Sequence, residues 1–74
     1  MRNISKETLA HLRAVYPAGA RVELISMDDP YNTQLMPGVK GTVVSVDDIG
    51  TIHVQWDCGS SLGVVYGVDH CKLL

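Results

Sequence analysis

The residues best suited to chemistry in this sequence are its three histidines and two cysteines. Structural zinc sites use closely spaced ligand pairs such as Cys-x₂₋₄-Cys and His-x₃₋₅-His. Neither spacing occurs here, and two adjacent ligands in a strand would point to opposite sides of it. We therefore expect no bound metal and no other cofactor. The side chains considered are His11, His53, Cys58, His70 and Cys71.

Aspartates are the second group that could do chemistry, as a general acid and base. All of those considered lie in or beside predicted turns, where their side chains accept hydrogen bonds from nearby backbone amides. A nucleophilic Cys58 paired with His53 or His70 would lack a third group to orient the base. So small a chain also has little room for a deep pocket, and we expect no enzymatic activity. The aspartates are Asp28, Asp29, Asp47, Asp48, Asp57 and Asp69.

Length and composition indicate one small globular domain over residues 1–74. The 46% hydrophobic and 19% charged residues are ordinary for a folded chain, and 74 residues are too few for a second core. Six Lys and Arg against eight Asp and Glu give a net charge of −2, with the cations dispersed along the chain. Nucleic-acid binding, which uses clustered cations, would require Arg2, Lys6, Arg13 and Lys40 to converge in space.

The sequence also predicts a cytoplasmic protein. Its first residues lack the apolar core of a signal peptide, and no apolar run approaches the length that spans a bilayer. In the cytoplasm thiols stay reduced, so we expect Cys58 and Cys71 to be free rather than bridged.

The N-terminal segment predicts one helix over about residues 5–16. Ser5 is suited to the N-cap, and Glu7 places a carboxylate at the positive end of the helix dipole. Pro17 ends the helix. Apolar residues recur at intervals of three and four and form one stripe that must pack on something, namely Leu9, Leu12, Val15 and Tyr16.

Residues 20–74 predict a sheet of about five short antiparallel strands that closes into an SH3-like barrel, because closure removes exposed edges. The clearest local element is a hairpin of residues 41–46 and 51–56 around the turn 47–50. Trp56 lies on the apolar face of the second arm. We expect it to be buried against Val22, Leu24, Val44 and Val54.

The segment 28–38 is the longest irregular stretch and contains three apolar side chains, Tyr31, Leu35 and Met36. One interpretation is that these side chains fold back and cap the barrel. The other is that they contact a partner, together with Tyr66. In that case the charge of Asp28 and Asp29 would favour a basic partner.

A family likeness is carried by residues 16–24, 27–31, 37–38, 41–43, 46–48, 50–63 and 67–69. These stretches resemble an uncharacterised bacterial and phage family, domain of unknown function 4314. The likeness covers nearly the whole chain and departs from the family pattern at Cys58 and near Tyr66. The resemblance implies the fold and a bacterial or mobile-element origin, and it offers no catalytic residues. The Gly-Thr-Val and Val-x-Trp-Asp-x-Gly order is also similar to more distant SH3-like barrels, including a zinc-free, peptide-binding module of ubiquitin ligases.

These observations predict a non-enzymatic interaction module that binds a peptide or protein through the 28–38 loop, without contact to a membrane. The alternative is an accessory nucleic-acid-binding domain of a phage or mobile element. We expect the chain to be a monomer or a weak homodimer.

Overall fold

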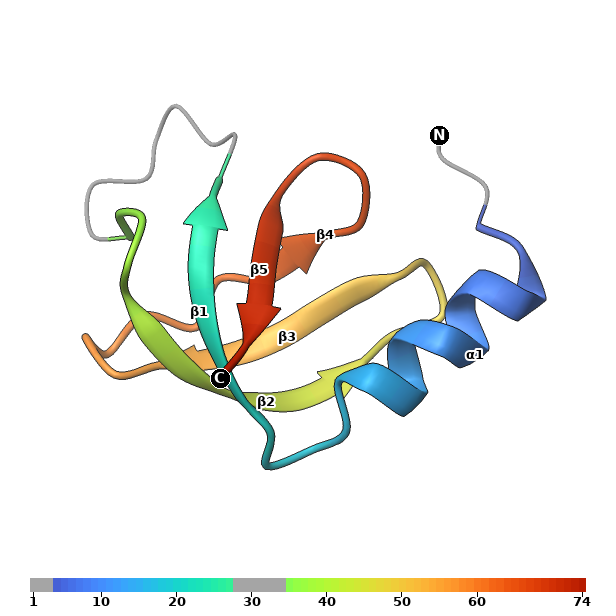
Figure 1. The fold of residues 1–74 in the computed structure, drawn as a ribbon, viewed down its shortest axis with the longest axis horizontal. Coiled ribbons are helices and arrows are strands. Elements are labelled where there is room, and N and C mark those ends of the chain that lie inside the picture. Colours follow the sequence, from blue (N-terminus) through green and yellow to red (C-terminus); the bar gives the residue numbers. More distant parts are fainter. Residues whose placement is uncertain (1–3, 28–34) are drawn as a thin grey trace.

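The computed structural model describes residues 4–27 and 35–74 and consists of one helix beside one antiparallel sheet (Figure 1). No helix in this part of the chain has the length and apolar character needed to cross a membrane. In chain order the elements are α1 (Lys6–Val15), β1 (Arg21–Ser26), β2 (Lys40–Val46), β3 (Thr51–Trp56), β4 (Val64–Val65) and β5 (His70–Leu73).

Helix α1 begins and ends where the sequence predicts. The Ser5 side chain accepts a hydrogen bond from the Thr8 N–H at 3.1 Å, which satisfies one of the first-turn amides. Tyr16 is the C-cap, and its N–H donates to the Leu12 carbonyl at 2.8 Å. Leu12 is the buried residue of the helix and packs into the core.

The sheet has the strand order β4-β3-β2-β1-β5, with every neighbouring pair antiparallel. β1 and β5 cross the direction of β2 and β3, so the sheet is strongly bent (Figure 1). Within the described residues, however, β4 and β5 do not pair, and the sheet is open. The coarser prediction of a mainly β fold with five antiparallel strands is confirmed; the predicted closure is not.

Local hydrogen bonds explain why the sheet stays open. β4 has two residues, and the turn that follows it occupies the outward main-chain groups of Val65. The Val65 carbonyl accepts from the N–H groups of Val68 and Asp69 at 3.0 and 2.9 Å. The Val65 N–H donates to Asp69 Oδ2 at 3.1 Å. These bonds use groups that a ladder with β5 would need.

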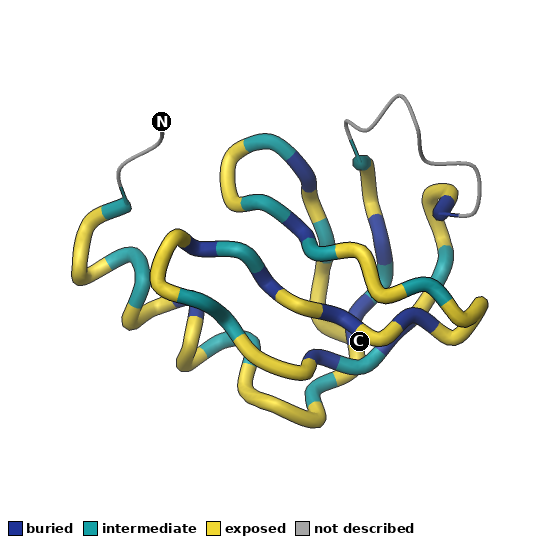
Figure 2. The backbone as a smooth tube through the Cα atoms, turned by 180° about the vertical axis from the view of Figure 1, so that it is seen from behind, coloured by how far each residue is buried: buried dark blue, intermediate teal, exposed yellow. Residues whose placement is uncertain are grey.

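The core lies on the inner face of the sheet, where buried positions alternate with exposed ones (Figure 2). Trp56 is 1% exposed, as predicted, and its Nε1–H donates to the Leu62 carbonyl at 2.8 Å. β2 passes closely over this ring: a Cβ at Gly41 would lie 2.9 Å from Trp56 Cε3 and 2.6 Å from Val54 Cγ1. The core residues are Leu12, Val22, Leu24, Leu35, Val43, Ile52, Val54, Trp56 and Val64.

The prediction that Val44 packs on Trp56 is wrong. Val44 is 57% exposed, and Val43 holds the buried position instead. A β-bulge shifts the β2–β3 register between Val43 and Ser45, so that Val43 and Val46 both face the core and Val44 lies on the outer face. The hairpin itself is confirmed. Asp47 holds its turn by accepting from the N–H groups of Ile49 and Thr51 at 3.1 and 2.9 Å.

Candidate functional site

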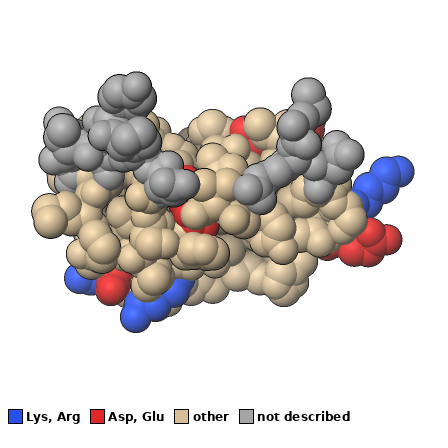
Figure 3. All heavy atoms as spheres, turned by 90° about the horizontal axis from the view of Figure 1, so that it is seen from above, with Lys and Arg blue, Asp and Glu red and all other residues tan. Residues whose placement is uncertain are grey.

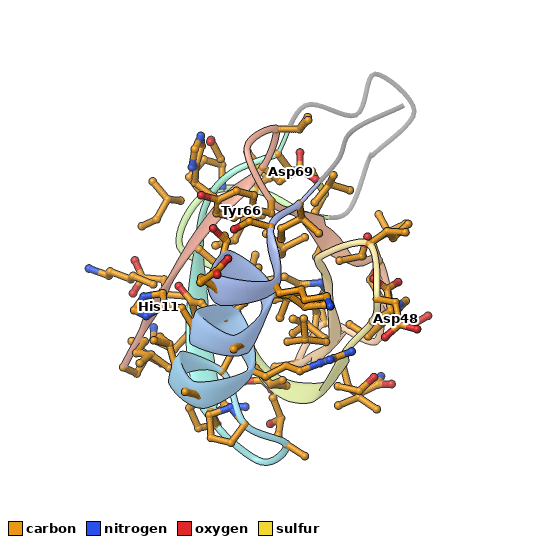
Figure 4. The ribbon with its side chains drawn as sticks, turned by 90° about the vertical axis from the view of Figure 1, so that its right-hand side faces the viewer. His11, Asp48, Tyr66 and Asp69 are labelled. Atoms are coloured by element: carbon orange, nitrogen blue, oxygen red, sulfur yellow. The ribbon has the colours of Figure 1, made fainter. Side chains whose placement is uncertain are left out.

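One concavity in the described part of the chain is a groove of about 440 Å³ between α1 and the ends of β4 and β5. Its floor is apolar and consists of Leu12, Ile52 and Val64, which are between 2% and 5% exposed. Figure 4 shows His11 on α1 and Tyr66 and Asp69 on the turn beside it, with Asp48 on the other side of the helix. The remaining lining residues are Val15, Tyr16, Gly67, His70 and Cys71.

The groove exists because β4 and β5 diverge from the turn 66–69 without pairing. The main-chain groups of Cys71 point away from β1, because the Leu74 N–H donates to the Arg21 carbonyl and successive residues alternate in direction. The Tyr16 hydroxyl donates to this outward Cys71 carbonyl at 3.3 Å. The helix end thus covers part of the free edge of β5.

The Cys71 thiol and the Tyr16 phenol, which both line the groove, are neutral near pH 7. Burial raises the pKa of Tyr16, and the neighbouring Cys71 raises it further. Burial also raises the pKa of Cys71, although the hydrogen bond to Tyr16 opposes this shift. A thiol with a raised pKa is a poor nucleophile, since the thiolate is the reactive form. These two side chains therefore suit contact rather than covalent chemistry.

Asp69 is 7% exposed and is the carboxylate in the lining of the groove. Its bond to the Val65 N–H gives it the turn role that the sequence predicts. In the described part of the chain, no group of three or more His, Cys, Asp or Glu side chains could hold a metal ion. The two cysteines are free, with Cys58 exposed and Cys71 half-buried.

The predicted contact residues are distributed over different parts of the fold. Tyr31, Asp28 and Asp29 lie outside the described residues. Leu35 is 5% exposed and belongs to the core. For this side chain, burial agrees with the interpretation that the loop residues fold back onto the sheet. Met36 is 67% exposed, and Tyr66 is 47% exposed and lines the groove.

The sequence predicts that Val15 and Tyr16 pack under the helix, and the structure places both of them in the groove lining. The sequence analysis did not identify His11 and His70 as groove residues, although both line it. The groove depends on the open sheet, and the prediction of a closed barrel left no place for it. The available signal for an open sheet was Asp69. Its carboxylate can accept a hydrogen bond from a nearby backbone N–H, and here it accepts from Val65 at the end of the two-residue strand β4.

The cations that the nucleic-acid alternative needs do not gather within the described residues. Lys6 and Arg13 lie on α1, whereas Lys40 begins β2 at the opposite end of the molecule (Figure 1). Arg13 is also engaged, since it donates to Asp48 Oδ1 at 2.7 Å and to the Val46 carbonyl at 3.4 Å. Arg2 lies outside the described residues. This arrangement gives the alternative no common basic surface.

Fold and groove define a small mainly β domain with one covering helix and an apolar groove at the open side of its sheet. The chain matches the family described as Domain of unknown function (DUF4314) over residues 5–74, and it belongs to this family. No curated protein matches it.

Proposed function

We propose that this protein is a non-enzymatic interaction domain that binds an extended segment of a protein or peptide partner in the groove between α1 and the β4–β5 turn. The observation that carries the proposal is the apolar floor of Leu12, Ile52 and Val64 in a concavity of about 440 Å³. Binding sites are usually concave, mostly apolar and furnished with a few polar groups.

The rim supplies those polar groups. His11 and His70 are exposed on opposite walls, and the exposed Tyr66 offers an aromatic ring with a polar tip. Tyrosine is enriched at protein interfaces because it combines a large contact area with few rotatable bonds. The neutral Tyr16 and Cys71 side chains favour an apolar occupant at the β5 wall.

We also propose the 28–38 loop as a second contact of the same partner. The exposure of Met36 supports this role, since a large apolar side chain in solvent gains from being covered. The groove is the primary site because it combines a concave shape with an apolar floor, whereas Met36 offers a single exposed side chain.

We also propose an SH3-like fold type, a cytoplasmic location and a bacterial or phage origin for this domain. The pairing of the last strand, β5, with β1 supports an SH3-like barrel that is open between β4 and β5. The free thiols of Cys58 and Cys71 support a cytoplasmic location. The family resemblance supports a bacterial or phage origin.

The test is selection of a random peptide library on the immobilised protein, followed by NMR titration of the selected peptides. We expect shift changes at Leu12, Val64 and His70, and a loss of affinity of about tenfold or more in His70→Ala combined with Tyr66→Ala. Val44→Ala is the matched control, because Val44 is exposed on the outer face. Failure to select any peptide, or shift changes confined to other surfaces, would refute the groove as the binding site.

A further inference from the structure

The free edge of β5 presents main-chain groups to the side on which α1 lies. Leu24 is the residue of β1 opposite Cys71. The Leu24 main chain turns away from β5, since it donates to the Val39 carbonyl and accepts from the Gly38 N–H, both at 2.8 Å. Opposite residues in an antiparallel pair either bond to each other or both point away, so Cys71 also points away from β1. Leu73, two positions further along, points the same way, and Figure 1 shows β1 and α1 on opposite sides of β5.

Most of these groups are unused. Within residues 4–27 and 35–74, the N–H of Cys71 and both main-chain groups of Leu73 have no hydrogen-bond partner. The Cys71 carbonyl accepts from the Tyr16 hydroxyl at 3.3 Å, but a carbonyl oxygen has two lone pairs and can accept a second bond. Because Tyr16 lines the groove, its bond shows that a donor in the groove reaches the edge of β5.

Apolar surface adjoins this edge. Cys71 packs against the core, and the groove that it lines has Ile52 and Val64 in its floor. Successive side chains of a strand point to opposite faces, so every second side chain of a strand added to β5 would lie toward this floor. Figure 3 shows the molecule from above, on the side of the turn 66–69, where most of the described surface is uncharged. The surroundings therefore favour main-chain and apolar contacts over ion pairs.

We propose that the partner segment binds by strand addition. It pairs through its main chain with Cys71 and Leu73 on the free edge of β5, and it places alternate apolar side chains on the groove floor. This inference rests on the proposed function of the groove and adds how the segment is held. In such complexes main-chain bonds give affinity, and pockets for every second side chain give specificity. The partner is a protein with an exposed segment of alternating apolar and polar residues, without proline where an N–H must donate to β5.

N-methylation of a bound peptide tests this binding mode without altering the protein. The probe is the tightest short peptide selected on the immobilised protein from a library in which valine or leucine alternates with random residues. Each methyl group removes one main-chain donor. Affinity should fall about tenfold at every second position, where the N–H bonds to Cys71 or Leu73, and change little at the positions between.

Hydrogen exchange gives the matching measurement on the protein. Peptide binding should slow exchange of the Cys71 and Leu73 amides about tenfold or more, because both acquire an acceptor. The Lys72 amide lies between them in sequence and points to β1, so it should change little and serves as the internal control.

A pair of variants separates the main chain of Leu73 from its side chain. Leu73→Pro removes the outward N–H without breaking a bond to β1, and Leu73→Ala is the matched control that keeps it. The proline variant should bind about tenfold more weakly than the alanine variant. Thermal melts check that both variants fold, and the methylation pattern decides if Leu73→Pro does not.

The outcomes distinguish this inference from the groove proposal on which it rests. A peptide that binds in the groove without the alternating methylation pattern, and without slower exchange at Cys71 and Leu73, would overturn strand addition and leave the groove as a binding site. Failure to select any groove-binding peptide would overturn both.

Discussion

The phenol of Tyr16 donates a hydrogen bond to the main-chain carbonyl of Cys71 at 3.3 Å and so joins the residue that ends α1 to the free edge of β5. The two residues are 55 positions apart in sequence. Both residues line the groove, and their hydrogen bond satisfies a carbonyl that an unpaired strand edge would expose. It therefore links the helix to the part of the sheet that remains open.

Removing this link should loosen the helix end. Tyr16→Phe keeps the ring and deletes the donor, and the expected cost is about 0.5–1.5 kcal/mol of unfolding free energy. Denaturant titration measures the cost, and hydrogen exchange of the Tyr16 amide, which bonds to Leu12, reports local opening. Ser61→Ala removes an exposed hydroxyl and serves as control. Unchanged stability together with unchanged exchange would mean that the bond contributes nothing.

The same pair predicts a loss of stability at alkaline pH. The pKa values of Cys71 and Tyr16 are raised above their ordinary values of 9.0 and 10.0 in the folded chain. The unfolded chain therefore releases these protons first, and the stability that is complete below the ordinary pKa values is lost as pH rises through the raised ones. Unfolding free energy should fall between about pH 8 and 11.

Cysteine variants separate the two contributions to this profile. In Cys71→Ala the fall should begin at higher pH, since the tyrosine alone remains, whereas Cys58→Ala should leave the profile unchanged because Cys58 is exposed. Denaturation curves at closely spaced pH values provide the measurement. Identical profiles for the wild type and Cys71→Ala would contradict the assignment of a buried thiol.

The close approach of β2 to the core predicts a steric effect at Gly41. In Gly41→Ala the new Cβ would lie 2.9 Å from the Gln55 carbonyl oxygen and from the Trp56 ring, neither of which can move freely. The expected destabilisation is about 1–3 kcal/mol. Gly59, at a φ of 98° with open space around it, is the comparison. Gly59→Asn introduces backbone strain at this positive φ but no steric contact, and it should cost less than Gly41→Ala, below about 1 kcal/mol, because Asn is among the side chains that best tolerate positive φ. Equal thermal stability of both variants would argue against close packing at Gly41.

Local signals in the sequence predict local structure well here. The cap at Ser5 and the hairpin around Asp47 are each built from residues close in sequence, and both are found where predicted. Burial of Trp56 also follows from its alternation in β3. The position of Val44 could not be read in this way, because a bulge shifts the period by one residue without a sequence signal of its own.

The groove was harder to predict because it depends on a competition between distant and local hydrogen bonds. Strand pattern favours closure of the sheet, yet the Asp69 turn occupies the outward groups of Val65 and leaves β5 without that partner. Tyr66 was predicted as a contact from its residue type, and in the structure it lines the groove, as His70 does. Neither pairing nor non-pairing of β4 and β5 can be derived from the periodicity of two short segments.

The final prediction distinguishes packing from binding at the two loop residues that the structure describes. Leu35→Ala should cost about 2–5 kcal/mol, because its side chain is 5% exposed in the core. Met36→Ala should change stability by less than about 0.5 kcal/mol, since this side chain is 67% exposed. Thermal melts test both values, and titration with a groove-selected peptide or partner then measures affinity in the folded Met36→Ala protein. A loss of affinity without a loss of stability would identify Met36 as a contact. Full affinity would limit binding to the groove and leave this loop with its packing role, which Leu35 fulfils.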